Sequence, residues 1–558
     1  MHQLNRRTGT EDWGVVLSPG APDRLMHRGI VLFRAGFKVP GLKFLERAVQ
    51  VQRDDALARE NLGVALLELG KFDQALLQMH HSLASACDRP SVYIHYGSIL
   101  RQINQRDNAI VSYRRYLFLD LSRADVVNAL AVLLDESNQP DQAATLYCQA
   151  IALSPGDGEF LSNFSETLGG DNATSKQAIR WGRRAVDSEP TNPAVLFSHG
   201  CLLNKTRELS GARDAFERVL RILPNHAEAR FNRALILLLC GELSEGWREY
   251  EWRWRTSALL SCGGRSEAAL PLPSKESLRQ SVLVLTHEQG LGDTIQFCRY
   301  GRLASAAGAK IVLVAPESLV RLLSAQPWIS SVIKIGRSLP ISDRSYPMMS
   351  LPLVFGTTLA TIPYRTEPYL QPPADDVNRW RDHLQKEFGQ RRFRVGLVWN
   401  GGFRADRPEL WLVNQRRNVP LKLFAQALDL PGMDFISLQK GEPAESELRG
   451  QERDYWRVGR LLNASAQLGD FADTAGLIAN LDLIVTVDTS VAHLAAALGK
   501  PTWILNRHDT CWRWFMDRDD SPWYASVKLY RQGPDRDWRP VLHRLASDLV
   551  KLAEQWGS

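Results

Sequence analysis

The sequence predicts two architectures in one chain: an all-α repeat superhelix in the first half and an α/β fold of two similar domains in the second. The helical prediction rests on small residues that recur at a nearly constant spacing up to about residue 257. The α/β prediction rests on short apolar runs that alternate with helical stretches from residue 281 onward. Because 558 residues are too many for a single hydrophobic core, several domains are expected.

The composition is that of an ordinary globular chain, with 44% apolar and 23% charged residues. The 68 basic residues barely exceed the 62 acidic ones, so bulk charge favours neither a nucleic-acid nor a membrane partner. Seven cysteines are scattered singly, which predicts reduced thiols in a cytoplasmic protein and no zinc site. We expect no transmembrane segment, because no apolar run approaches the span of a bilayer.

The helical half repeats with a period of 34 residues, which is the period of tetratricopeptide repeats. Small residues separated by 34 residues, with a single step of 35, mark the first helix of each unit: Gly29, Gly63, Gly97, Ala131, Ser165, Gly200 and Ala234. A second small residue recurs in the following helix: Ala75, Ala109, Ala143, Ala178 and Ala212. Prolines that cannot continue a helix follow at Pro155, Pro190 and Pro224. The longer step fits an insertion at 169–172.

We therefore expect about seven repeats over residues 22–257, forming a right-handed superhelix with a concave face. Such surfaces serve recognition and carry no chemistry of their own, so this half predicts a protein partner on the concave face. Trp247, Tyr250 and Trp254 lie on one helical stripe, which we expect to seal the last repeat against the next domain. Residues 258–280 are predicted to be a linker.

The second half predicts two Rossmann-like domains, at 281–372 and 373–558. Strands are expected in the first at 282–285, 311–314 and 332–335, and in the second at 394–399, 435–438, 483–487 and 502–505. Two α/β domains that face each other leave a cleft between them, which is the usual place for a ligand.

A glycine turn follows the first of these strands, at Gln289-Gly290-Leu291-Gly292-Asp293. It is not a dinucleotide-binding turn, because Ile295 stands where a third glycine is needed. Asp293 is expected to open a helix that continues from about Thr294. The stretch by itself leaves two roles open for Asp293, a helix cap or a base that takes a proton from a substrate.

A second candidate site is Asp488-Thr489-Ser490-Val491-Ala492-His493, which follows the apolar strand at 483–487. Thr489 and Ser490 are expected at a helix N-terminus, where backbone N–H groups favour a phosphate. His493 is expected one turn inside that helix, pointing the same way. An ordinary capped loop would explain the first residues but not a histidine in an apolar helix.

Two more strand-to-loop junctions carry residues suited to the same ligand. Asn400 is followed by a glycine that permits close backbone approach. Arg417 belongs to a basic pair, and arginine suits bidentate phosphate contacts, although a charged loop pair is more often only solvated.

These motifs resemble those of the heptosyltransferase-like glycosyltransferases with the GT-B fold, and the whole chain resembles bacterial proteins that join tetratricopeptide repeats to such a domain. The matching stretches are 288–293, 417–420, 437–441 and 487–501, together with a tail at 512–524. The resemblance implies that Asp293 is the catalytic base beside an acceptor-side loop of Gln289, Gly290 and Gly292. It also implies donor binding by Asn400, Arg417, Lys440, Asp488, Thr489, Ser490 and His493. Ser490 departs from the glycine of the relatives, which puts the identity of the donor in doubt.

The implied reaction is an inverting displacement that moves a sugar from a nucleotide sugar to an acceptor, with no cofactor and no metal. The repeats would present a protein acceptor, since similar repeat-linked enzymes modify bacterial proteins, flagellins among them. Two alternatives stay open: a transferase that acts on a lipid-linked glycan, and a non-catalytic adaptor that keeps the fold for binding.

Overall fold

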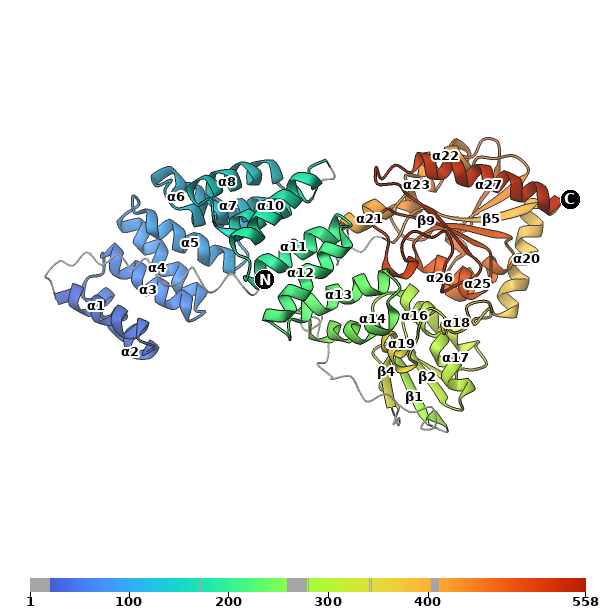
Figure 1. The fold of residues 1–558 in the computed structure, drawn as a ribbon, viewed down its shortest axis with the longest axis horizontal. Coiled ribbons are helices and arrows are strands. Elements are labelled where there is room, and N and C mark those ends of the chain that lie inside the picture. Colours follow the sequence, from blue (N-terminus) through green and yellow to red (C-terminus); the bar gives the residue numbers. More distant parts are fainter. Residues whose placement is uncertain are drawn as a thin grey trace. The chain divides into compact units, whose positions relative to one another are not determined.

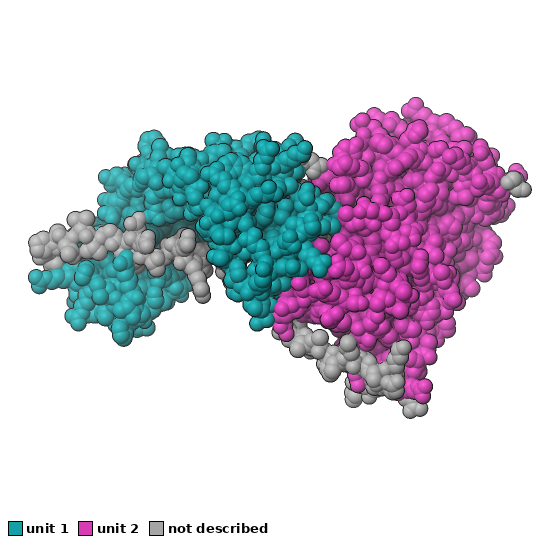
Figure 2. All heavy atoms as spheres, viewed as in Figure 1, with its two compact units in different colours: residues 1–229 teal, residues 230–558 magenta. Residues whose placement is uncertain are grey.

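The structure is a computed structural model that describes residues 21–170, 173–257, 278–279, 281–340, 342, 344–402 and 411–557. The chain divides into two compact units, residues 1–229 and 230–558 (Figure 2). Most of the expected linker at 258–280 and part of the insertion at 169–172 lie outside the described residues. The expected domain limits stay predictions.

The first unit is built from helices that pack in consecutive pairs, coloured blue to green in Figure 1. The helices are α1 Ala21–Arg34, α2 Lys38–Val51, α3 Ala56–Glu68, α4 Phe72–Ser85, α5 Pro90–Gln102, α6 Arg106–Leu119, α7 Ala124–Glu136, α8 Pro140–Leu153, α9 Gly158–Leu168, α10 Ser175–Ser188, α11 Pro193–Lys205 and α12 Leu209–Ile222. Each expected repeat in this unit is one pair of helices, which confirms the tetratricopeptide-type array.

Close packing within each pair explains the small residues. A Cβ added to Gly63 would lie 2.7 Å from Cε of Met79 in the partner helix. At Gly97 it would lie 2.7 Å from the Tyr113 ring, and real Cβ atoms do not approach this closely. The small residues of the second helices, such as Ala75, are fully buried. Small residues therefore let the paired helices approach, and large side chains from the partner helix fill the contact.

The last helical pair, α13 (Ala227–Leu239) and α14 (Leu243–Tyr250), leads into η1, a 3₁₀ turn at Glu251–Arg255. Trp247 of α14 is buried, and its ring centroid lies 6.0 Å from that of Phe297 and 5.3 Å from that of Trp512 in the α/β region. Tyr250 is buried beside it. Trp247 and Tyr250 therefore make the expected contact with the α/β region, whereas Trp254, the third residue of the predicted stripe, lies in η1 and is only partly buried.

The first sheet is parallel, with the order β3-β2-β1-β4. Its elements are β1 Val282–Thr286, α16 Leu291–Phe297, α17 Arg299–Ala306, β2 Lys310–Ala315, α18 Glu317–Ser324, β3 Ser331–Lys334, β4 Arg344–Pro347, η3 Met348–Ser350 and α19 Leu351–Val354. The three expected strands are confirmed. Strand β4 was not predicted, because an edge strand of sequence Arg-Ser-Tyr-Pro has no apolar run.

The second sheet is also parallel, with the order β10-β9-β8-β5-β6-β7. Its strands are β5 Phe393–Val398, β6 Met433–Ser437, β7 Arg460–Asn463, β8 Leu483–Val487, β9 Thr502–Asn506 and β10 Val527–Arg531. Its helices and 3₁₀ turns are α20 Ala374–Phe388, α21 Trp411–Arg417, α22 Leu421–Leu428, α23 Ala444–Leu448, α24 Glu452–Tyr455, η5 Ser465–Gln467, α25 Phe471–Ala479, α26 Ser490–Ala497, η6 Trp512–Trp514 and α27 Arg539–Gly557. The four central strands were predicted, and the edge strands β7 and β10 were not.

Helices cover both faces of this second sheet. Phe424 of α22 and Leu545 of α27 belong to one buried cluster with Val395 and Val485 of the strands. Figure 1 shows α22 and α27 along one face and α25 and α26 along the other. Strands buried on both faces read as continuous apolar runs, which is why the central strands were visible in the sequence.

Strand order locates a ligand crevice in each sheet. The chain order reverses beside β1, which lies between β2 and β4, and beside β5, which lies between β6 and β8. Ligands of open parallel sheets bind outside the carboxyl ends of the strands at such reversals. The segments that follow β1, β5 and β8 carry Asp293, Asn400 and Asp488, with Asp293 already inside the helix that comes after β1.

Candidate active site

Asp293 lies in the first turn of α16, whose N-cap is Gly290. The helix begins at Leu291, so the prediction that it starts at Asp293 was wrong by two residues. Oδ2 of Asp293 accepts a hydrogen bond of 2.9 Å from the Gly290 backbone N–H. The capping role is therefore confirmed, because a carboxylate at this position satisfies an N–H group that the helix leaves open. The other oxygen, Oδ1, faces Arg513.

The loop before α16 is held by the last helical pair. Gln289 adopts a left-handed backbone with φ of 62°, and its Nε2 donates to the Tyr250 hydroxyl at 2.8 Å. Glu288 accepts from Nε and Nη2 of Arg253, at 2.5 and 3.0 Å. Arg253 is fully buried, so the pair excludes water and fixes the loop. Sequence reasoning missed this pair, because nothing in the sequence relates residues 35 positions apart.

Arg513 of η6 is the second group on the Asp293 carboxylate, since its Nη2 donates to Oδ1. The side chains of Arg513 and Asp293 are only 12% and 14% exposed. Burial alone would lower the pKa of Arg513, and the facing Asp293 carboxylate raises it above its ordinary value. The sequence showed Arg513 only as part of the tail that resembles repeat-linked enzymes.

Gly292 joins the two candidate sites. A Cβ on Gly292 would lie 2.8 Å from Cδ2 of His493 and 3.5 Å from Cα of Ser490. The first turn of α16 therefore packs directly on the first turn of α26, and only glycine permits this approach. Thr489 is the N-cap of α26, as expected. Its hydroxyl does not cap the helix but pairs with that of Thr486 at 3.1 Å, so a simple capped loop does not explain this residue.

His493 is buried inside the first turn of α26, as the spacing predicted. Its Nδ1 lies 3.0 Å from the Tyr524 hydroxyl, and its ring stacks on Trp514 at a centroid distance of 5.1 Å. Burial lowers the pKa of His493 to about 4. The negative charge of Asp488 opposes this shift, and the positive charge of Arg513 adds to it. The imidazole is therefore neutral near pH 7 and acts as a hydrogen-bonding group rather than a cation.

A buried hydrogen-bonded cluster stands behind this histidine. Arg299 is fully buried and donates to the Tyr369 hydroxyl at 3.1 Å and to the Trp523 carbonyl at 2.9 Å. The Tyr369 and Tyr524 hydroxyls lie 3.3 Å apart. Because Tyr524 in turn contacts His493, the cluster fixes the orientation of the imidazole ring. Arg299 and Tyr369 lie in no matching stretch, and Trp523 and Tyr524 appeared in the sequence only as part of the tail at 512–524.

Arg417 lies at the reversal between β5 and β8. Its Nη1 donates to the Asp488 carbonyl at 3.0 Å, and its Nη2 donates to Oδ1 of Asn414 at 2.6 Å. The guanidinium covers Gly401, where an added Cβ would lie only 1.9 Å from Nη2. Arg417 is thus not a merely solvated loop residue, and the glycine beside Asn400 makes room for an arginine side chain.

Asn400 and Lys440 are joined through a buried glutamine. Oε1 of Gln439 accepts from the Asn400 N–H at 3.0 Å, and its Nε2 donates to the Asn400 and Lys440 carbonyls at 3.0 Å. Lys440 Nζ donates to the Ser465 carbonyl at 2.9 Å, although half of the side chain is exposed. The loops after β5 and β6 are therefore held together, and Gln439 is a positioning residue that the sequence did not reveal.

The structure thus brings the predicted residues to one place along the carboxyl edges of both sheets. Gly292 contacts the α26 segment that carries Ser490 and His493. Asp293, the next residue, pairs with Arg513, and Arg417 binds the Asp488 carbonyl. Which of them contacts donor or acceptor stays a prediction. Within the described ranges no three His, Cys, Asp or Glu side chains gather as metal ligands would, and the metal-free mechanism likewise stays a prediction. In the same ranges no helix is long and apolar enough to cross a bilayer.

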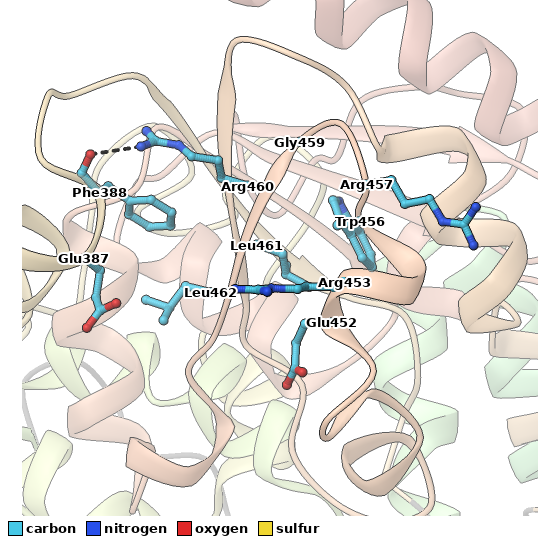
Figure 3. Close-up of a pocket in the computed structure, with 10 residues that line it drawn as sticks. All are labelled: Glu387, Phe388, Glu452, Arg453, Trp456, Arg457, Gly459, Arg460, Leu461 and Leu462. Carbon is cyan, nitrogen blue, oxygen red and sulfur yellow. Dashed lines mark hydrogen bonds between the residues drawn. The ribbon is translucent and has the colours of Figure 1, made fainter.

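A separate cavity of about 600 Å³ lies at the outer edge of the second sheet (Figure 3). It is lined by Glu387, Phe388, Glu452, Arg453, Trp456, Arg457, Gly459, Arg460, Leu461 and Leu462. Phe388 precedes β5 and Gly459 precedes β7, so the cavity opens toward the amino ends of parallel strands. Ligands of such sheets bind at the carboxyl ends, and none of the predicted site residues lines this cavity.

Helical pairs of tetratricopeptide type are followed by two parallel α/β sheets, an architecture consistent with a repeat array joined to a GT-B glycosyltransferase fold. Residues 465–507 match the model of glycosyltransferase family 9 (heptosyltransferase). This segment contains α25, β8 and the Asp488–His493 motif. The chain therefore joins a tetratricopeptide-type array to an α/β region, part of which is similar to the heptosyltransferase family of glycosyltransferases.

One relative spans nearly the whole chain. Protein FlbA of Caulobacter vibrioides is 26% identical over 582 residues, which cover 92% of this chain and 91% of that protein. Cellulose synthase operon protein C of Pseudomonas fluorescens is 25% identical over 174 residues, covering 29% of this chain and 13% of that protein. The match to FlbA therefore extends over both the helical and the α/β parts of this chain.

Two solved structures are similar to part of this chain. YrrB, a tetratricopeptide repeat protein with an unusual peptide-binding site, covers 33% of this chain and 95% of its own at 17% identity and a TM-score of 0.29. PilF of Pseudomonas aeruginosa covers 38% of this chain and 96% of its own at 17% identity and a TM-score of 0.34.

Proposed function

We propose that the protein transfers a sugar from a nucleotide sugar to a hydroxyl of an acceptor. One observation carries the proposal: the Asp293 turn packs on the N-terminus of α26 through the contact of Gly292 with His493. A carboxylate next to a helix N-terminus that suits a phosphate supports a glycosyl transfer site, because the two groups can serve the acceptor and the donor. The match of residues 465–507 to the heptosyltransferases supports the same reaction class.

The proposed reaction is a single displacement with inversion. Asp293 takes the proton of the acceptor hydroxyl, whose oxygen forms a bond to the anomeric carbon. The bond from that carbon to the diphosphate oxygen breaks, and the electron pair leaves with the nucleoside diphosphate. Arg417 and the N–H groups at the start of α26 stabilise the leaving charge, and neutral His493 contributes a hydrogen bond. In this scheme, the transfer of the sugar requires no metal ion.

The proposed acceptor is a protein that docks on the helical repeats. Several large apolar side chains of the first unit are exposed, among them Phe37 at 60%, Val111 at 65% and Phe118 at 78%. Exposed apolar side chains on a repeat array support binding of a polypeptide. The isolated thiols support a cytoplasmic enzyme, where such groups stay reduced.

A panel of nucleotide sugars tests the proposal. The full chain is incubated with UDP-, GDP-, ADP- and CMP-linked sugars, with and without a lysate of acceptor proteins, and nucleotide release is measured. We expect release from one donor, stimulation by the protein fraction and a matching mass increase on a polypeptide. Tight nucleotide binding without turnover of any donor would instead identify an adaptor. Stimulation only by a lipid extract would identify a lipid-linked glycan as the acceptor.

A further inference from the structure

We propose that Arg513 is a donor-phosphate ligand that holds the Asp293 carboxylate when no donor is bound and releases it when a diphosphate binds. This inference rests on the proposed function, and it adds the residue that couples donor binding to the base. Arg513 lies in η6 of the second α/β domain, whereas Asp293 lies in α16 of the first. The pair therefore connects the donor side and the acceptor side of the candidate site.

The guanidinium of Arg513 has more donors than the protein satisfies. Its Nη2 donates to Asp293, and its Nη1 donates to Sγ of Cys511 at 3.0 Å. Its Nε is buried without an acceptor among the described residues. A thiol is a weak acceptor, and a buried donor without a partner costs about 1–3 kcal/mol. A buried arginine with this deficit is suited to an anion that supplies several oxygens.

The surroundings of Arg513 place that anion at the start of α26. The neighbouring residue Trp514 stacks on His493 in the first turn of this helix. Gly292, which precedes Asp293, packs on His493, and Asp293 itself pairs with Arg513, so the side chains of Asp293, Arg513 and His493 lie close together. A diphosphate at the N-terminus of α26 is therefore within reach of Arg513, while Arg417 approaches the same segment from the side of β5.

Both oxygens of Asp293 are engaged in this structure. Oδ2 accepts from the Gly290 N–H and Oδ1 accepts from Arg513. An acceptor hydroxyl would therefore compete with a guanidinium for Oδ1. When diphosphate oxygens take over Arg513, the hydroxyl donates its proton to Oδ1, and its oxygen bonds to the anomeric carbon. The bond from that carbon to the diphosphate breaks, and Arg513 neutralises the oxygen that keeps the electron pair.

Calorimetric titration of the full chain with inorganic pyrophosphate tests this competition. Asp293→Asn keeps the shape of the side chain but removes the charge that competes for Arg513, so pyrophosphate should bind at least threefold more tightly than to the wild type. Arg513→Gln should bind it at least tenfold more weakly, and Arg513→Lys should recover part of the loss. Arg518→Gln is the matched control, because Arg518 lies in the same loop but pairs with exposed Asp520. It should bind as the wild type does.

With a nucleotide-sugar donor, Arg513→Gln should raise the KM for the donor and lower kcat, whereas a purely structural role would change folding stability without this split. Unchanged pyrophosphate affinity in Asp293→Asn overturns the inference even if Arg513→Gln fails to fold. Equal affinity losses in Arg513→Gln and Arg518→Gln also overturn it, because the effect is then one of net charge. The proposed function fails separately, if Asp293→Asn retains full turnover.

Discussion

Replacing Gly401 by alanine should displace Arg417 and weaken donor binding without unfolding the protein. The added Cβ would lie 1.9 Å from Nη2 and 2.3 Å from Cζ of Arg417, whereas real Cβ contacts do not fall below 3.0 Å. The guanidinium must therefore move by about 1 Å or more, a distance that breaks its hydrogen bonds to the Asp488 carbonyl at 3.0 Å and to Asn414 at 2.6 Å.

The size of the effect follows from the contact that is lost. A hydrogen bond from a charged donor contributes about 1.5–3 kcal/mol, and about 1.4 kcal/mol corresponds to a factor of ten in affinity. Gly401→Ala should therefore raise the KM for the nucleotide sugar about 10- to 100-fold. Stability should change by about 1 kcal/mol or less, because the colliding group is the end of a flexible side chain.

The assay compares donor KM from nucleotide release and the midpoint of urea unfolding for the wild type, Gly401→Ala and Gly402→Ala. Gly402 is the control, since a Cβ there meets nothing within 4 Å and its backbone is not left-handed. This absence of contacts holds for the described residues, and the KM of Gly402→Ala should stay within about threefold of the wild type. If Gly401→Ala behaves like Gly402→Ala, Arg417 does not bind the donor from the position that the structure gives it.

Three further predictions concern the residues around the site. His493 binds a proton less readily when folded, because burial lowers its pKa from 6.5 to about 4. The unfolded chain therefore binds more protons between these values, and up to about 3 kcal/mol of stability should be lost as pH falls from about 6.5 to 4. Urea unfolding at pH 7.5 and at pH 5 should show a smaller loss of unfolding free energy in His493→Gln than in the wild type. An equal loss in both proteins would contradict the lowered pKa of His493 in the folded state. Trp247→Ala should lower the free energy of unfolding by about 3–5 kcal/mol, because the fully buried ring contacts three aromatic side chains of the α/β region. Trp556→Ala should lower it by less than about 1 kcal/mol, because that ring is 42% exposed. If guanidinium unfolding shows similar losses of stability for the two variants, Trp247 does not stabilise the contact between the last repeat and the α/β region. Arg253→Met leaves the buried Glu288 carboxylate without its main partner and should cost about 3–5 kcal/mol, most of which should return when Glu288→Gln is added. Strict additivity of the two changes would show that the pair is not coupled.

The repeats could be predicted because every helical pair needs a small residue at the same position of the repeat. Gly63 and Gly97 each make room for a large side chain 16 positions later, so the same steric demand returns every 34 residues. The central strands β5 and β8 could be predicted because both of their faces are buried and the residues are apolar throughout. Strand β4 could not, since an edge strand is specified by its partner β1 rather than by its own side chains.

Some residues of the candidate site could also be predicted from the sequence, and others could not. Asp293 and His493 could be located because each follows a buried strand within a few residues, where a turn and a helix N-terminus are expected. The contact of Arg513 with Asp293 joins residues 220 positions apart, so only the folded chain brings them together. The same holds for Tyr524 beneath His493. Local motifs therefore gave the groups proposed for the chemistry, and tertiary structure gave the groups that hold them.

The central claim is that Asp293 is the base of a glycosyl transfer, and nucleotide release by Asp293→Asn tests it most directly. With the best donor and a saturating acceptor, kcat should fall about 10²- to 10⁴-fold, because general base catalysis contributes that much. The donor KM should be equal to or lower than that of the wild type, and the unfolding midpoint should shift little, since asparagine can still accept from the Gly290 N–H. A kcat within threefold of the wild type in a folded variant would contradict the claim, and Asp293 would then be a helix cap and nothing more.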